Sequence, residues 1–205
     1  MSFERFRRDI SSEVFDYQLI AGYFGGIKKV RDKVSSLVAA GKIIRLKKGL
    51  YVFGEDWRLS PLNLEVIASV LYGPSCISFE YALSAYGLIA ERAQVITSLA
   101  IGDTKSYDTP VGRFEYQAID PKKFKEGIEY RDLGRKGGYF IASREKAVID
   151  LVYRTPGIRT LEQLRFYLFE EMRLEESMFR EFDFKKLDAI SKVYGKHSVR
   201  MLSEL

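Results

Sequence analysis

The sequence predicts an α+β protein, with an N-terminal winged helix-turn-helix followed by a mixed α+β domain that ends in a helical C-terminal tail. Three observations support this prediction. Apolar residues recur at helical spacing between residues 27 and 38, a short basic hairpin follows them, and strand-like and helix-like segments alternate after Pro61. A chain of 205 residues with 46% apolar content can form two small domains, which we expect at residues 1–56 and 57–205.

The first expected helix is short and begins near Ser2, with its apolar side chains packed inward. Three arginines, Arg5, Arg7 and Arg8, then lie on its surface. An alternative for the same arginines is an extended arm that enters a minor groove of DNA.

A helix-turn-helix is expected next. Its first helix spans residues 11–21, with Ser11 or Ser12 as the N-cap, and the glycines at 25 and 26 form the turn. Gly41 ends the second helix. The apolar residues of this second helix fall within one narrow arc, and they are Ile27, Val30, Val34, Leu37 and Val38.

A basic β-hairpin is expected over residues 43–53, where two β-rich runs flank Lys47-Lys48-Gly49. Helix, turn, second helix and hairpin occur in the order of a winged helix. In that arrangement the second helix enters a major groove and the hairpin contacts the neighbouring backbone.

The charge of the chain is concentrated in this N-terminal part. The whole chain carries +5, while residues 1–53 hold 11 basic and 5 acidic side chains, a net charge of +6. Between Lys28 and Lys48 there are eight cations and a single acid, Asp32. This asymmetry favours a polyanionic partner at the N-terminal domain.

We therefore predict a DNA interface formed by the second helix and the hairpin, with double-stranded operator DNA as the partner. The lysines and Arg45 would neutralise phosphates, the two serines would bond base edges or backbone, and Arg31 lies on the flank of the apolar stripe. The alternative is that the helix and the hairpin tip are ordinary solvent-exposed surface, on which lysines are common. The candidate DNA-binding residues are Lys28, Lys29, Arg31, Lys33, Ser35, Ser36, Arg45, Lys47 and Lys48.

Residues after 61 predict the α+β domain and its tail. Helices are expected at 62–72, 78–86, 143–153, 161–172 and 184–194, and strands at 95–101, 114–119, 128–132 and 139–142. Ser78 and Ser143 are expected as N-caps, and Gly87 as the end of the second of these helices.

No catalytic residue, metal ligand set or cofactor motif emerges from the sequence. The single histidine, His197, lies in the helical tail without a Gly-x-Ser-x-Gly motif, and we expect it at the surface. The triplets that begin at Asp103, Asp120 and Asp183 have the acid-x-Lys pattern of metal-dependent nucleases. A nucleic-acid-processing enzyme that uses the basic domain to bind substrate is therefore the alternative function, and a protein-binding module is the third.

Cysteine content and hydropathy indicate the compartment. Cys76 is the only cysteine, so no intramolecular disulfide can form, and its apolar neighbours predict a buried, inert thiol. No apolar run approaches the roughly 20 residues needed to span a bilayer. We expect a cytoplasmic protein without membrane segments.

Several motifs in the second domain, taken with the basic domain, resemble the AbiEi-type antitoxins, the winged-helix regulators of type IV toxin-antitoxin systems. The resemblance covers most of the chain. It departs from the family at Phe79 and Tyr81, and it is loose after Pro156. The motifs that carry it are Lys48-Gly49-Leu50-Tyr51, Ile77-Ser78-Phe79-Glu80-Tyr81-Ala82-Leu83 with Gly87-Leu88, Thr109-Pro110-Val111-Gly112-Arg113-Phe114, Ile141-Ala142, Glu145-Lys146-Ala147 and Asp150-Leu151.

The resemblance implies a repressor that binds the promoter of its own operon, with antitoxin activity in the C-terminal part. It also implies a functional partner, a nucleotidyltransferase-like toxin encoded next door. Neutralisation in such systems need not involve direct contact between the two proteins. The operator sequence and the oligomeric state do not follow from the sequence.

Overall fold

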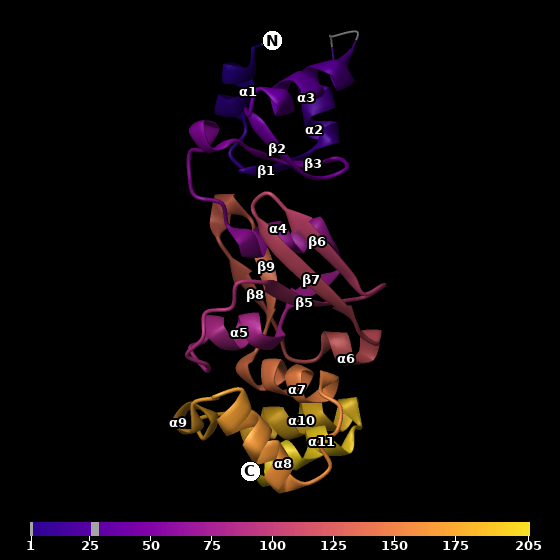
Figure 1. The fold of residues 1–205 in the computed structure, drawn as a ribbon. Coiled ribbons are helices and arrows are strands. Elements are labelled where there is room, and N and C mark those ends of the chain that lie inside the picture. Colours follow the sequence, from indigo (N-terminus) through magenta and orange to yellow (C-terminus); the bar gives the residue numbers. More distant parts are fainter. Residues whose placement is uncertain (1, 26–28) are drawn as a thin grey trace.

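The computed structural model describes residues 2–25 and 29–205, and it shows a mixed α+β fold in which the described residues form eleven α-helices and two sheets. The N-terminal unit, a six-stranded sheet and a helical tail follow one another along the length of the molecule, with the chain ends at opposite poles (Figure 1). The predicted α+β class is confirmed.

The N-terminal unit is a three-helix layer on a small sheet. The sheet is antiparallel throughout, with the strand order β1-β3-β2. Its elements are α1 (Phe3–Asp9), β1 (Val14–Asp16), α2 (Tyr17–Tyr23), α3 (Val30–Ala39), β2 (Ile43–Lys47) and β3 (Leu50–Phe53), and a 3-10 turn at Glu55–Trp57 follows.

The first expected helix is confirmed as α1, which Ser2 caps by accepting a hydrogen bond from the Arg5 amide at 3.3 Å. The arm alternative is wrong, because the three arginines lie on this helix. Arg7 is even buried, with its guanidinium 2.8 Å from the Glu13 carboxylate and 3.9 Å from the centre of the Phe53 ring.

The expected helix at residues 11–21 is wrong at its start. Strand β1 occupies Val14–Asp16, and Asp16 rather than Ser11 or Ser12 caps the helix that follows. The cause is tertiary: the Glu13 carbonyl accepts a hydrogen bond from the Phe53 amide at 3.2 Å, so this segment extends the sheet instead of coiling.

The second helix and the hairpin are confirmed in outline. Helix α3 buries Val34 and Leu37, as the apolar arc predicts, whereas Ile27 lies outside the described residues. Gly41 follows its end with φ +66°, and Gly49 turns the hairpin with φ +85°. Both values favour glycine, which lacks the side chain that disfavours this region.

The second domain is built on a six-stranded mixed sheet with strand order β6-β7-β5-β4-β9-β8, in which the β5–β7 and β4–β9 pairs are parallel. Helix α4 packs on one face, where Tyr116 donates to the Ala68 carbonyl at 2.7 Å. The elements are α4 (Leu64–Leu71), β4 (Ser75–Ile77), α5 (Phe79–Ala85), β5 (Ile96–Ala100), β6 (Lys105–Thr109), β7 (Gly112–Ala118), α6 (Pro121–Lys125), β8 (Ile128–Asp132), a 3-10 turn (Gly134–Lys136), β9 (Gly138–Ala142) and α7 (Arg144–Arg154).

The helical tail packs beneath α7, at the end of the molecule opposite the N-terminal unit (Figure 1). The expected helix at 161–172 is α8 continued as a π-helical turn, and the expected helix at 184–194 is confirmed. The elements are α8 (Leu161–Arg165), the π-helical turn (Phe166–Glu171), α9 (Glu176–Phe179), α10 (Phe184–Tyr194), α11 (His197–Arg200) and a final 3-10 turn (Met201–Glu204).

The two units share the small sheet. One face of the hairpin, with Tyr51 and Phe53, belongs to the core of the N-terminal unit. The other face, with Leu46, Leu50 and Val52, is part of the core of the second domain. The expected boundary at residue 56 lies inside the exposed 3-10 turn, and the hairpin before it contributes side chains to both cores.

Candidate nucleic-acid interface

Helix α3 presents a polar face next to the hairpin. Its apolar side chains pack against the core of the N-terminal unit, so Arg31, Ser35 and Ser36 on the other side are exposed. The position of Arg31 is set by helical geometry, because a residue one step after Val30 and three before Val34 lies beside the buried stripe. Arg31 lines the same hollow as residues of the hairpin.

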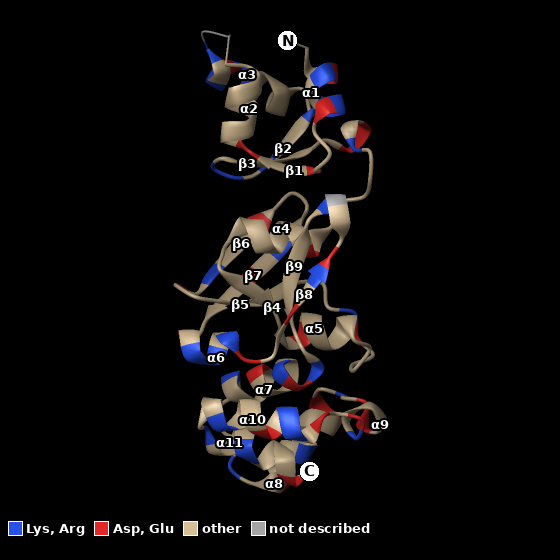
Figure 2. Cartoon of the chain, turned by 180° about the vertical axis from the view of Figure 1, so that it is seen from behind, with Lys and Arg blue, Asp and Glu red and all other residues tan. Residues whose placement is uncertain are grey.

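The hairpin supplies two further cations on the same side. Arg45 is paired in register with Tyr51 and is exposed, with its Nε 3.4 Å from the Lys47 carbonyl oxygen. Lys48 occupies the turn before Gly49 and is also exposed. Figure 2 shows basic residues at the β2–β3 turn and, beside an acidic one, at the start of α3.

A basic groove of about 630 Å³ lies between α3 and the hairpin. Three of its lining residues are cations from two elements, and the lining contains no acid. Such a concave surface of fixed positive charge favours a phosphate-bearing ligand. We use the name basic groove for the surface formed by Tyr17, Arg31, Val34, Ser35, Arg45, Lys48, Gly49 and Tyr51.

The remaining predicted residues of α3 lie outside this groove. Lys29 is exposed and stands 3.9 Å from Asp32. Lys33 is half-buried, with its ammonium 5.9 Å from the centre of the Phe24 ring. Ser36 is exposed on the outer face. The predicted contact Lys28 lies outside the described residues.

Lys47 has a different position from its neighbour Lys48. A register shift between Arg45 and Lys47 sets Lys47 opposite Leu50, whose side chain faces the second domain. The Lys47 ammonium donates a hydrogen bond to the Leu71 carbonyl at the end of α4. Burial and the nearby Lys105 lower the pKa of Lys47. This lysine joins the two units and is directed away from the basic groove.

The acid-x-Lys triplets of the second domain do not form a common site. Asp120 and Asp183 cap α6 and α10 by accepting amide hydrogen bonds, and Asp103 pairs with Lys105 at 3.4 Å. Within residues 2–25 and 29–205, no three His, Cys, Asp or Glu side chains converge as metal ligands. The expected positions of His197, at the surface, and Cys76, buried, are confirmed. Burial raises the pKa of the Cys76 thiol, which suits an unreactive group.

A buried polar network joins α5, α7 and α10. Ser78 donates to Asp150 at 2.6 Å, and so does not cap α5 with its side chain as expected. Lys146 lies 3.2 Å from the same carboxylate and 2.6 Å from the Tyr194 hydroxyl, and Tyr194 also bonds Asp150. Desolvation raises the pKa of Asp150, against the pull of Lys146. Sequence reasoning missed this network, although the i, i+4 spacing of Lys146 and Asp150 was a signal for it.

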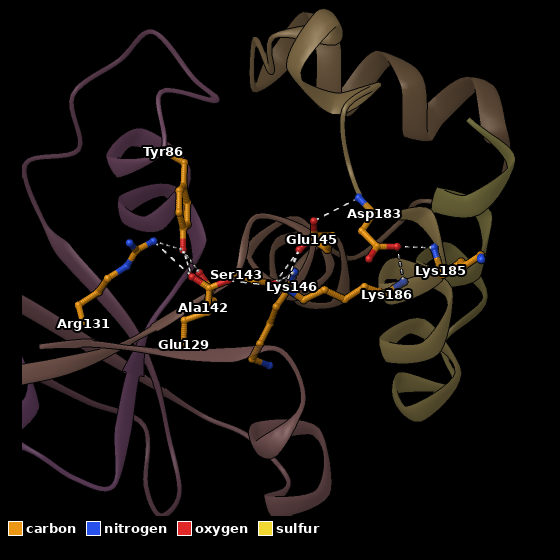
Figure 3. Close-up of polar contacts among 10 residues, drawn as sticks. All are labelled: Tyr86, Glu129, Arg131, Ala142, Ser143, Glu145, Lys146, Asp183, Lys185 and Lys186. Carbon is orange, nitrogen blue, oxygen red and sulfur yellow. Dashed lines mark hydrogen bonds and ion pairs between the residues drawn. The ribbon is translucent and has the colours of Figure 1, made fainter.

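Glu145 connects the start of α7 to the helical tail (Figure 3). Its carboxylate accepts from the Ser143 hydroxyl at 2.8 Å and stands 3.2 Å from the Lys186 ammonium, and Ser143 caps α7 as predicted. Desolvation pushes its pKa upward, but its own amide, Ser143 and Lys186 outweigh that effect, so the pKa of Glu145 is lowered. The contacts are structural, since each polar group of this junction bonds another part of the chain.

Among the described residues, no helix has the length and apolar character needed to cross a membrane. Comparisons with known proteins do not identify a ligand for the basic groove. No family model matches the sequence, and a search of the curated proteins gave no match to it.

Proposed function

We propose that residues 1–56 are a winged helix that binds double-stranded operator DNA through the basic groove, and that the protein is a sequence-specific transcriptional regulator. The observation that carries this proposal is the convergence of Arg31, Arg45 and Lys48 on one groove without an acid. Lysine and arginine side chains that neutralise phosphates supply most of the affinity for a duplex. Ser35, on the α3 wall of the groove, is then the best placed of the two serines to bond a base edge.

The resemblance to AbiEi-type antitoxins extends the proposal. The regulated operon would be the protein's own, and the functional partner a nucleotidyltransferase-like toxin. The helical tail lies at the end of the molecule opposite the N-terminal unit, so it stays accessible while DNA is bound (Figure 1). We place catalysis second, because the nuclease-like triplets lie on separate elements, where Asp120 and Asp183 cap helices and Asp103 pairs with Lys105.

The test is fluorescence anisotropy with duplexes from the promoter region upstream of the gene. We expect the triple variant Arg31→Ala/Arg45→Ala/Lys48→Ala to lose roughly 100-fold in affinity at moderate salt, since three phosphate contacts are removed. The matched control, Lys122→Ala/Lys125→Ala/Arg200→Ala, removes the same charge from exposed positions of the second domain and tail and should bind as the wild type does.

Equal loss of affinity in the two triple variants would show that only net charge matters, and it would overturn the assignment of the basic groove. Wild-type binding that is weak and insensitive to salt would instead support a protein-binding module. For the wild type we expect the logarithm of the affinity to fall steeply with the logarithm of the salt concentration, by about 0.9 for each neutralised phosphate.

A further inference from the structure

Strand β8 is an open edge of the six-stranded sheet. It pairs with β9 on one side, and no described strand pairs with it on the other (Figure 1). Open edges invite pairing with another chain, and proteins usually protect them with charged side chains, lysine above all, or with proline or a β-bulge. Residues 128–132, Ile-Glu-Tyr-Arg-Asp, contain neither proline nor lysine, and the β8–β9 register is regular.

The backbone groups that face this open edge can be identified. The Ser143 amide donates to the Gly127 carbonyl, and the Leu133 amide to the Gly137 carbonyl, both at 2.8 Å. Bonded positions alternate along an antiparallel pair, so odd-numbered residues of β8 bond β9. The N–H and C=O groups of Ile128, Tyr130 and Asp132 therefore point outward.

Several side chains of β8 are also partly exposed. Tyr130 and its cross-strand neighbour Phe140 form a pair with ring centres 5.1 Å apart, and they are 55% and 47% exposed. On the other face, Glu129 and Arg131 are 40% and 47% exposed and lie 3.3 Å apart; both also contact the Tyr86 hydroxyl, and Glu129 stands 3.6 Å from Lys186 (Figure 3). An edge with exposed aromatic rings on one face and both signs of charge on the other is suited to a specific partner.

We propose that this partner is a second copy of the chain, joined by antiparallel pairing of β8 with β8 about a two-fold axis at Tyr130. This register matches the outward backbone groups of Tyr130 with those of the same residue in the copy. It also sets Glu129 opposite the copy's Arg131, twice, at non-hydrogen-bonded positions where Cα atoms approach to about 4.5 Å. The four rings of Tyr130 and Phe140 then form one patch across the axis.

Charge selects this register over its neighbours. A shift by two residues in one direction places Arg131 opposite Arg131, and in the other direction it places Glu129 opposite Glu129. Like charges at directly opposed positions destabilise a strand pair. All three registers are two-fold symmetric, as an isologous dimer requires, and of the three only the register centred on Tyr130 pairs opposite charges.

The other open edge of the sheet, β6, provides an internal comparison. Pairing of two β6 strands about Tyr107 would set Ser106 opposite Asp108, without complementary charges. Pro110 also follows this strand directly. The dimer is thus assigned to β8, and it is independent of DNA binding because the basic groove lies on the other unit.

Sedimentation of the full chain without DNA tests the proposal. The wild type should show a mass that rises with concentration from 23.6 kDa towards twice that value. Glu129→Arg and Arg131→Glu each oppose like charges and should weaken the association about tenfold. The double variant Glu129→Arg/Arg131→Glu restores complementarity and should recover it, whereas Asp108→Arg on β6 should have no effect.

A cross-link tests the register directly. Tyr130→Cys brings two thiols together at a bonded pair, where the Cα separation of about 5.5 Å suits a disulfide. We expect a covalent dimer on mild oxidation, and none for Asp108→Cys; the native Cys76 is buried and does not compete. A wild type that stays monomeric up to near-millimolar concentration, or single charge variants that associate as well as the wild type, would overturn the proposal. If the variant Arg45→Ala/Lys48→Ala loses DNA binding but still sediments as a dimer, the result supports a dimer interface that is separate from the basic groove.

Discussion

Individual side chains in this protein owe their roles to position more than to residue type. Lys47 and Lys48 are adjacent lysines, yet one bonds the second domain and the other lines the basic groove. Among the acids, Glu129 is partly exposed while Glu145 has only 4% of its surface exposed and still keeps a lowered pKa. A charge removed from water needs its own hydrogen bonds and counter-charge, and Glu145 has both.

Glu145 therefore gives the fold a predictable acid sensitivity. Its pKa is lowered in the folded state, so its stabilising contribution is complete above the ordinary value of 4.5 and is lost as pH falls through the folded pKa. We expect Glu145→Gln to be less stable than the wild type at neutral pH, with the difference shrinking below about pH 4.5. Urea unfolding measured between pH 3 and 7 gives both curves.

The matched control for this experiment is Glu181→Gln. Glu181 is 70% exposed and stands 4.0 Å from Arg144, at the same junction of α7 and the tail. Exposed pairs of this kind contribute little to stability. A difference between wild type and Glu145→Gln that stays constant across the pH range would show that Glu145 acts through packing and not through its charge.

At the scale of single elements, a register shift in the hairpin directs neighbouring basic side chains to different parts of the molecule. Regular alternation would have set Lys47 on the same face as Arg45, towards the basic groove. The register shift between them instead directs Leu46 and Lys47 together to the second domain. Near its tip the hairpin thus directs Arg45 and Lys48 to the basic groove, and Leu46 and Lys47 to the second domain.

Neighbouring variants should separate these two faces. Lys48→Met is expected to weaken DNA binding and to reduce the slope of log affinity against log salt by about 1, because one phosphate contact is lost. Lys47→Met should leave that slope unchanged and lower the free energy of unfolding by about 1 kcal/mol, through its lost bond to Leu71. Anisotropy titrations at several salt concentrations and urea unfolding measure the two effects. A reduced slope in Lys47→Met would place this lysine on the DNA side.

Elements with strong local signals were predictable, and those decided by distant partners were not. The apolar arc of α3 and the glycine of the hairpin turn are written in neighbouring residues. Taken alone, residues 14–16 favour a helix. They form a strand in the structure because β3 pairs with them. Strand β6, at Lys105–Thr109, was missed because a polar edge strand shows no apolar pattern, and β4, at Ser75–Ile77, because three residues are too few to show one.

The candidate site was predictable only as a set. The composition predicted where the basic segment lies. It did not predict which cations of that segment line the groove together. Arg31 was expected on a flank and lies on the groove wall, while Lys29 and Lys33 lie outside it. That sorting depends on how α3 is rotated against the hairpin and on the register shift before Lys47, and neither property is encoded in a short stretch of sequence.

At the scale of the whole molecule, the small sheet contributes side chains to the cores of both units. The hairpin contributes Leu46, Leu50 and Val52 to the core of the second domain, and its opposite face to the core of the first. A sheet buried on both faces cannot keep one core intact while the other is lost. DNA bound in the basic groove would therefore be held at a fixed orientation to the second domain, and to the proposed β8 interface.

Unfolding measured by two probes tests this coupling. Trp57, the only tryptophan, packs against Phe3 with ring centres 4.8 Å apart, so its fluorescence reports the N-terminal unit, while far-ultraviolet circular dichroism reports the whole chain. We expect both signals to follow one urea transition. Leu46→Ala should lower the free energy of unfolding by about 2–5 kcal/mol, because it opens a cavity where the units meet, and it should shift both signals together. Two separate transitions in the wild type, or a shift of the fluorescence signal alone in the variant, would show that the N-terminal unit unfolds independently of the second domain.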